Sequence, residues 1–184
     1  MEEIALSEVQ EKGILQLAIK YKQEAKKCYK AKAYLSGCVL IGAAMETILL
    51  ATANCFTGNV LSSRSAPKKK GKIKRLDEFR FIDLIAVAKE LNWLPSELSP
   101  KDDWNNTKVK IGDYVEVVRQ IRNLIHPVRY INDFGRKRVT KKYYDACYEI
   151  VNTAVDHLDS IINNSLSIML EERERRVSEG DLVP

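Results

Sequence analysis

Residues 37–50 read GCVLIGAAMETILL and form the centre of the most apolar segment of the chain, Leu35 to Ala53. A helix that is apolar nearly all round is usually the most buried helix of its bundle. Glu46 is the one charged residue in the segment, and a carboxylate is costly inside a bilayer. We therefore expect residues 33–55 to form a buried central helix rather than a membrane span. Gly37 and Gly42 would let a neighbouring helix approach closely.

Helical periodicity continues on both sides of this segment. Ser7 and Gln10 have the spacing of a capping box, which predicts that a first helix begins at Ser7. Further apolar stripes predict helices from about Asp77 to Leu91, Lys110 to His126 and Thr140 to Arg175. Only 8 glycines and 5 prolines occur among 184 residues, which disfavours a turn-rich β-sandwich. We expect one all-α domain over 1–175, an antiparallel bundle of about five helices, and a flexible tail over 176–184.

Basic residues gather in two places, and the net charge is +5. The first is residues 56–76, which predict a long basic loop between the second and third helices. The second lies between the fourth and fifth helices. Dense positive charge binds backbone phosphates, but it can also serve only to keep a loop soluble. The residues that we single out as phosphate-binding are Lys68, Lys69, Lys70, Arg136, Lys137 and Arg138.

The segment RQIRNLIHPVR, from Arg119 to Arg129, carries the residues of greatest chemical interest. An α-helix advances about 100° per residue, so a helix continuing to His126 would align Arg119, Arg122 and His126 in one stripe. Imidazole moves protons near neutral pH, and guanidinium binds phosphate in a two-pronged geometry. A histidine beside two arginines suits cleavage of a phosphodiester by the 2′-hydroxyl of RNA.

The same spacing also permits a purely structural explanation. Cations near a helix C-terminus are stabilised by roughly 0.3–1 kcal/mol each, so His126 and the two arginines could act only in capping and surface pairing. Glu46 could be a hydrogen-bonded buried anchor, or it could orient Arg119, Arg122 or His126; the two roles are compatible.

Metal ligation has little support in the sequence. The chain has two histidines and four cysteines, and no two cysteines are close enough to suggest a chelating pair. Structural zinc sites use four such ligands at short spacing. We therefore expect neither a metal nor another cofactor.

The helix order, the apolar second helix with its glutamate and the tract RNLIHP resemble the HEPN family across roughly residues 7–170. HEPN domains are bundles of four or five helices with an arginine, four to six residues and then a histidine. The resemblance implies that His126 is the general acid or base and that Asn123 positions or polarises the phosphate. Arg122 precedes Asn123, but only three residues separate it from His126. Six residues separate Arg119 from His126, but Arg119 precedes Gln120. Either arginine could bind the scissile phosphate.

The resemblance implies a metal-independent endoribonuclease or RNA-binding protein, with RNA as its partner and a toxin or defence role. It also implies a homodimer, and an antitoxin or another protein as a further partner. The alternative is a non-catalytic helical module that binds a nucleotide or a partner protein. Residues 1–10 lack the basic start and apolar middle of a signal peptide, so we expect a cytoplasmic protein without membrane association.

If the basic clusters bind phosphates, the affinity for RNA should fall steeply as salt concentration rises. Replacing Arg136, Lys137 and Arg138 with Ser should flatten the dependence of log affinity on log salt, which a titration of labelled RNA at several salt concentrations measures. An unchanged slope would assign this cluster to solubility.

Overall fold

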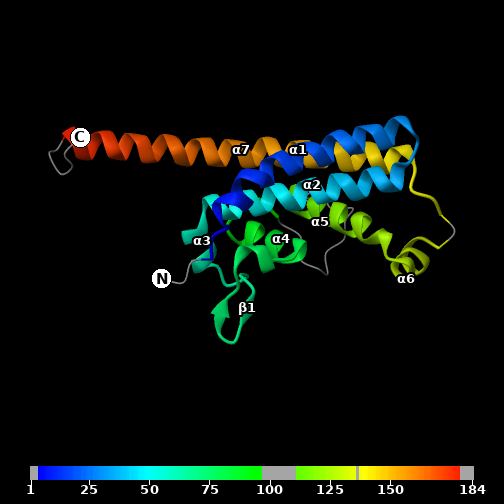
Figure 1. The fold of residues 1–184 in the computed structure, drawn as a ribbon, viewed down its shortest axis with the longest axis horizontal. Coiled ribbons are helices and arrows are strands. Elements are labelled where there is room, and N and C mark those ends of the chain that lie inside the picture. Colours follow the sequence, from blue (N-terminus) through cyan, green and yellow to red (C-terminus); the bar gives the residue numbers. More distant parts are fainter. Residues whose placement is uncertain (1–3, 97–110, 136, 179–184) are drawn as a thin grey trace.

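The computed structural model describes residues 4–96, 111–135 and 137–178, and within these ranges it is predominantly helical (Figure 1). The all-α class predicted from the sequence is confirmed. Arg136, the start of the predicted fourth helix at Lys110 and residues 179–184 of the predicted tail lie outside the described residues.

Helices α1 (Glu8–Lys30) and α2 (Tyr34–Cys55) form an antiparallel pair. The predicted capping box is present: the Ser7 hydroxyl accepts from the Gln10 backbone N–H, and the Gln10 side chain accepts from the Ser7 N–H at 2.9 Å. Helix α2 is long and apolar enough to cross a membrane, and half of its most apolar window is buried inside the structure. Its fully buried side chains include Cys38, Ile41 and Met45. Its position as the central helix therefore accounts for its composition.

The segment after α2 contains regular structure, so the prediction of a long loop over 56–76 is wrong. It folds into helix α3 (Thr57–Ser62), a hairpin of β1 (Lys68–Lys69) and β2 (Lys72–Ile73), and the turn η1 (Leu76–Glu78). Lys70 and Gly71 both have positive φ at the hairpin turn.

The Glu90 carboxylate fastens the start of the α3–β1 connection to the rest of the domain. It accepts hydrogen bonds from the Ser63 hydroxyl at 2.8 Å, the Arg64 N–H at 3.0 Å and the Ser65 N–H at 2.7 Å. These donors lower the pKa of Glu90 to about 2. The Glu90 carboxylate, charged at neutral pH, thus accepts from backbone N–H groups of this connection.

Helices α4 (Phe81–Glu90) and α5 (Ile111–Arg122) pack beneath α2. The fully buried Asp113 of α5 accepts from the Lys89 ammonium of α4 at 3.0 Å, and this pair ties the two helices together. Trp93 and Leu94, which follow α4, are 6% and 0% exposed. This layer continues the hydrophobic core that α2 begins.

The α-helix of the motif ends earlier than the sequence predicted. Helix α5 ends at Arg122, and the chain continues through the 3₁₀ turn η2 (Asn123–Ile125), the short α6 (Pro127–Arg129) and the π-helical turn η3 (Tyr130–Phe134). The prediction of one α-helix reaching His126 is therefore wrong. Proline disfavours helical geometry at the preceding residue, here His126. The chain changes to a tighter 3₁₀ turn three residues before His126.

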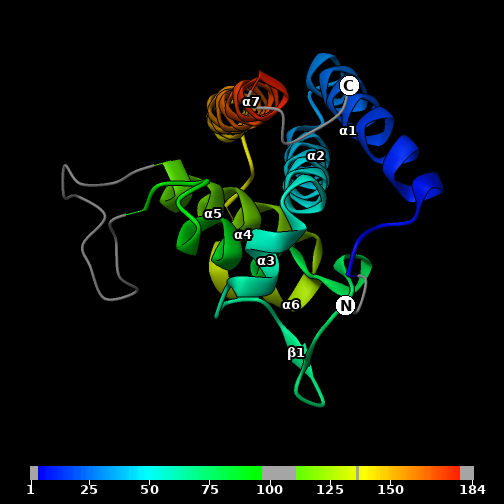
Figure 2. The ribbon, with the colours of Figure 1, turned by 90° about the vertical axis from the view of Figure 1, so that its left-hand side faces the viewer.

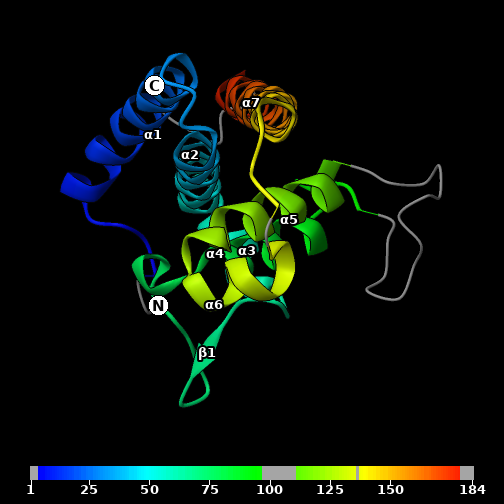
Figure 3. The same ribbon diagram turned by 90° about the vertical axis from the view of Figure 1, so that its right-hand side faces the viewer.

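Helix α7 (Lys141–Ser178) begins one residue after Thr140 and ends three residues beyond the predicted Arg175. It runs in the same direction as α2, whereas α1 and α5 run opposite to it (Figure 1). This parallel pair differs from the fully antiparallel bundle that the sequence predicted. Seen along the axis, α1 and α7 lie on one side of α2, and α4, α5 and α6 lie on the other (Figures 2 and 3).

Two glycines of α2 sit where neighbouring helices approach, as predicted. A Cβ at Gly37 would lie 2.6 Å from the Tyr144 ring of α7. A Cβ at Gly42 would lie 2.7 Å from Cβ of Arg122 on α5. Since Cβ is fixed to the backbone, Arg122 could not turn away from a larger residue at position 42.

We expect Gly42→Ala to lower the free energy of unfolding by about 1–3 kcal/mol, because overpacking outweighs the gain in helix propensity. Gly13→Ala in α1 is the matched control, since a Cβ there meets nothing within 4 Å. It should raise stability by up to about 1 kcal/mol. Urea unfolding of both variants gives the comparison, and equal shifts would contradict the proposed close packing.

Candidate functional site

Arg122 lies across α2 and ends at Glu46. Its aliphatic stem packs on Gly42, and its guanidinium Nη2 donates to Glu46 Oε2 at 2.6 Å, one helical turn further along α2. The two side chains are 29% and 25% exposed, so the pair is largely withdrawn from solvent. The Phe81 ring, with its centroid 5.8 Å from Cζ, covers the guanidinium. The sequence predicted that Glu46 is a buried anchor or a partner for Arg119, Arg122 or His126. In the structure its partner is Arg122.

The charge of Glu46 is set by opposing influences. Burial raises its pKa above the ordinary value, while the charge of Arg122 and a hydrogen bond from the Phe81 backbone act to lower it. The hydrogen bond comes from the first residue of α4, where helix N–H groups lack partners within the helix. The carboxylate thus joins three elements, α2, α4 and α5, at a single point.

Arg119 is held by its own helix. Its Nε donates to Glu116 Oε2 at 2.9 Å, and its side chain is 14% exposed. With the Asn123 amide oxygen turned toward the arginines, that oxygen accepts from Arg119 Nη1 at 3.0 Å and from Arg129 Nη1 at 3.3 Å. Asn123 therefore links the motif helix to α6. Arg129 was not among the residues predicted to be functional.

A cavity of about 490 Å³ opens beside these groups. The structure brings Glu46, Arg119, Arg122 and Asn123 together in its lining. Residues at and just before the start of α4, for which no functional role was predicted, complete the lining. Arg80 is the notable addition, since its Nε donates to Asp83 at 3.0 Å. The signal available in the sequence was a basic residue three positions before an aspartate at a helix start. The remaining lining residues are Phe79, Phe81 and Ile82.

His126 is exposed and is not part of that cavity lining. Its backbone has φ −80° and ψ 118°, its N–H donates to the Asn123 carbonyl at 3.1 Å, and its carbonyl accepts from the Tyr130 N–H at 2.9 Å. The straight Arg119–Arg122–His126 stripe predicted from one continuous helix is therefore wrong. The extended backbone ahead of Pro127 takes His126 off the helix axis and onto the surface.

The basic residues occupy two separate parts of the surface. Lys68, Lys69 and Lys70 are exposed on the hairpin, and Lys137 and Arg138 are exposed just before α7. Figure 1 places the hairpin at one edge of the domain and the start of α7 at another. They do not form one patch. The Lys137 carbonyl accepts from the Tyr130 hydroxyl at 3.0 Å, which attaches the second group to the turn that follows His126.

Comparisons with models of protein families, with curated proteins and with solved structures gave no significant match. Within the described ranges, no three His, Cys, Asp or Glu side chains are grouped so that they could hold a metal ion. The polar residues that line the cavity are Glu46, Arg80, Arg119, Arg122 and Asn123.

We expect Glu46→Gln to lower the free energy of unfolding by about 1–3 kcal/mol, because Arg122 keeps its charge but loses its ionic partner. Glu24→Gln is the matched control, since Glu24 pairs with Lys27 at 2.7 Å on the exposed surface of α1. Its effect should stay below about 1 kcal/mol. Chemical denaturation measures both, and similar losses would show that the Glu46–Arg122 pair has no special structural weight.

Proposed function

We propose that this protein is a HEPN-like, metal-independent RNA-binding protein and endoribonuclease. The observation that carries the proposal is the convergence of Arg80, Arg119, Arg122 and Asn123 on one cavity, with exposed His126 three residues after Asn123. Guanidinium groups bind phosphate oxygens and stabilise the charge that develops on them. An exposed imidazole can reach a substrate that lies across the mouth of the cavity.

In the proposed reaction the 2′-hydroxyl of RNA attacks the adjacent phosphorus while His126 accepts or supplies a proton. The bond from phosphorus to the 5′-oxygen breaks, and the 5′-oxygen leaves with a proton. The products are a 2′,3′-cyclic phosphate and a 5′-hydroxyl. Arg122 or Arg119 would hold the phosphate, and Asn123 would position it. The basic groups at 68–70 and 136–138 would bind flanking phosphates.

We also propose that the active form is a homodimer. Three large apolar side chains around His126 are solvent-exposed: Ile125 is 51% exposed, Val128 70% and Ile131 67%. Contiguous exposed apolar surface is typical of protein–protein contacts. A second copy covering these residues would place two His126 side chains near one shared boundary. The toxin or defence role, the antitoxin partner and the cytoplasmic location rest on the family resemblance and the sequence.

A specific observation supports the non-catalytic alternative. Each arginine of the cavity already has a carboxylate partner: Arg80 pairs with Asp83, Arg119 with Glu116, and Arg122 with Glu46. A phosphate would have to compete with these carboxylates for the guanidinium donors. The alternative function is a non-catalytic helical module that binds a nucleotide or a partner protein, with the arginine–carboxylate pairs serving a structural role.

Purified protein incubated with bulk RNA in EDTA should cleave it and leave cyclic phosphate ends, whereas DNA should be spared. His126→Ala should lower the rate by about 10²–10⁴-fold, as expected for the loss of an acid–base group. His157→Ala is the control, because it removes the other histidine of the chain. Circular dichroism checks that both variants stay helical.

Arg119→Ala and Arg122→Ala should be compared in the same assay to find which arginine binds the phosphate. The assay should be run over a range of pH values, because general acid–base catalysis depends on the protonation state of the catalytic group. If stoichiometric wild-type protein leaves RNA intact across this pH range, the enzymatic proposal fails and the binding module becomes the better explanation.

Light scattering at tens of micromolar should give the mass of a dimer. Val128→Asp should shift the protein toward the monomer, because a charge would then be buried in the proposed contact. Leu15→Asp is the control, since Leu15 is 57% exposed on α1, away from His126. A strictly monomeric wild-type mass would contradict the dimer.

A further inference from the structure

A cavity of about 320 Å³ lies at the base of the β1–β2 hairpin, which projects from the body of the domain (Figures 1 and 2). We call it the hairpin cavity. The charged residues of its lining are Lys69, Lys72, Lys74, Arg75 and Glu78. The lining thus carries four basic side chains against one carboxylate. A concave surface with this excess of positive charge favours an anionic ligand.

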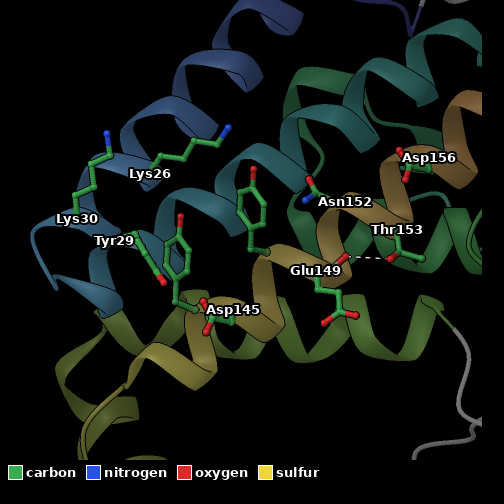
Figure 4. Close-up of a pocket in the computed structure, with 10 residues that line it drawn as sticks. Lys26, Tyr29, Lys30, Asp145, Glu149, Asn152, Thr153 and Asp156 are labelled. Atoms are coloured by element: carbon green, nitrogen blue, oxygen red, sulfur yellow. Dashed lines mark hydrogen bonds between the residues drawn. The ribbon is translucent and has the colours of Figure 1, made fainter.

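The groove between α1 and α7 is larger, about 620 Å³, but its charge balance is the reverse (Figure 4). Its aromatic lining consists of Tyr29, Tyr144 and Tyr148. Its charged lining residues are Lys26, Lys30, Asp145, Glu149 and Asp156. Three carboxylates against two lysines do not favour an anion. The hairpin cavity, rather than this groove, therefore has the charge that a phosphate group requires.

The register of the hairpin gathers its lysines on one side. Lys69 lies directly opposite Lys72 in the antiparallel pair, so the two side chains share a face. Lys74 lies two residues after Lys72 and points to the same face, and its N–H continues the ladder by donating to the Pro67 carbonyl at 3.0 Å. Like charges directly opposite each other destabilise a hairpin. An anion bound between these lysines would offset that repulsion.

The N-terminal segment fixes Arg75 at the base of the hairpin. The Leu76 N–H donates to the Ile4 carbonyl at 2.9 Å, and Arg75 Nη2 donates to the Ala5 carbonyl at 3.5 Å. Arg75 Nε also donates to Asp77 at 3.4 Å. Arginine has further N–H donors beyond these, and a guanidinium held in place is well suited to bind phosphate oxygens.

Glu78 is the one carboxylate of the lining, and it is weakly engaged. Its Oε1 lies 3.8 Å from Lys69 Nζ, and the two side chains are 46% and 68% exposed. An exposed ion pair of this length contributes little, so Lys69 can turn from Glu78 to a ligand at small cost. Glu78 should oppose an anion in the cavity without excluding it.

We propose that the hairpin cavity is a phosphate-binding site, with Lys69, Lys72, Lys74 and Arg75 as its ligands. Of the lysines predicted at 68–70, only Lys69 belongs to it. The arginine cavity is next along the chain, since Glu78 lines the first cavity and Phe79 lines the second. The occupant is therefore a backbone phosphate of the RNA strand that reaches the arginine cavity. This identification of the ligand rests on the proposed function, whereas the phosphate site does not.

Calorimetric titration of the whole protein with pyrophosphate tests the site itself. Lys69→Thr/Lys72→Thr should weaken binding by roughly tenfold or more, because two of the four cations are lost while threonine suits a strand. Glu78→Gln should strengthen binding by about two- to fivefold, because it removes the opposing charge. Circular dichroism checks that the variants stay folded.

Two further variants separate a built site from diffuse positive charge. Lys68→Thr/Lys70→Asn removes the same charge from the same hairpin but outside the cavity lining, and it should weaken binding much less. Asparagine is chosen at position 70 because φ there is 53°. Lys12→Ser/Lys20→Ser removes the same charge from exposed positions of α1 and should bind like the wild type.

A short single-stranded RNA, 2′-O-methylated so that it cannot be cleaved, identifies the source of the phosphate. Fluorescence anisotropy at several salt concentrations gives the slope of log affinity against log salt. Lys69→Thr/Lys72→Thr should make this slope shallower by about 1.4, since each phosphate contact on a single strand contributes about 0.7.

A response of RNA binding to Lys69→Thr/Lys72→Thr supports the backbone phosphate as occupant. If only pyrophosphate binding responds, the phosphate site stands, its ligand is a free phosphate compound, and the RNA identification fails. If neither ligand binds the wild type at millimolar concentration, or if Lys68→Thr/Lys70→Asn weakens both ligands equally, the proposal is overturned. Cleavage of bulk RNA that depends on His126 would be untouched by that last result.

Discussion

The close approach of α5 to α2 at Gly42 is the constraint on which the rest of the structure depends. Only a residue without a Cβ leaves room there for the stem of Arg122. That stem directs the guanidinium to Glu46, the single charge in an otherwise apolar helix. The carboxylate in turn accepts from the backbone at the start of α4. One small residue and one ion pair therefore set the relative positions of three helices, and with them the walls of the arginine cavity.

The electrostatics of the arginine cavity depend on how its arginines are paired. Each of the three arginines has a carboxylate partner: Arg122 pairs with Glu46 of another helix, whereas Arg80 and Arg119 each pair with a carboxylate three residues away. The same pairs fix the guanidinium groups in place, which favours recognition of a phosphate, and they neutralise charge, which opposes it. The balance between these effects is what separates an RNA-binding site from a structural network. Pro127 also matters, because the extended backbone before it leaves His126 on the surface and outside the lining of the cavity.

Helix α2 divides the molecule into two chemically different faces. The layer of α4 and α5 presents paired arginines, and the layer of α1 and α7 presents tyrosines bordered by lysines and carboxylates. Because α2 contributes buried apolar side chains to both layers, its composition resembles that of a membrane helix without requiring a bilayer. The arginine cavity and the α1–α7 groove lie on opposite sides of one buried helix.

The sequence by itself determined the all-α class, the central helix, the capping box at Ser7 and the close contacts at Gly37 and Gly42, because these follow from local periodicity, propensity and side-chain size. It also selected Glu46 and the two motif arginines, because a lone charge in an apolar helix needs a partner. Tertiary structure decided which arginine reaches Glu46, brought in Arg80 and Arg129, and joined Tyr29 to Tyr148 across the groove. Residues 56–76 fold into a helix and a hairpin, and His126 lies outside the helical stripe. Most of these outcomes depend on contacts between segments far apart in the chain. The position of His126 depends on the change from α-helix to 3₁₀ turn after Arg122. Residue spacing alone does not encode either of them.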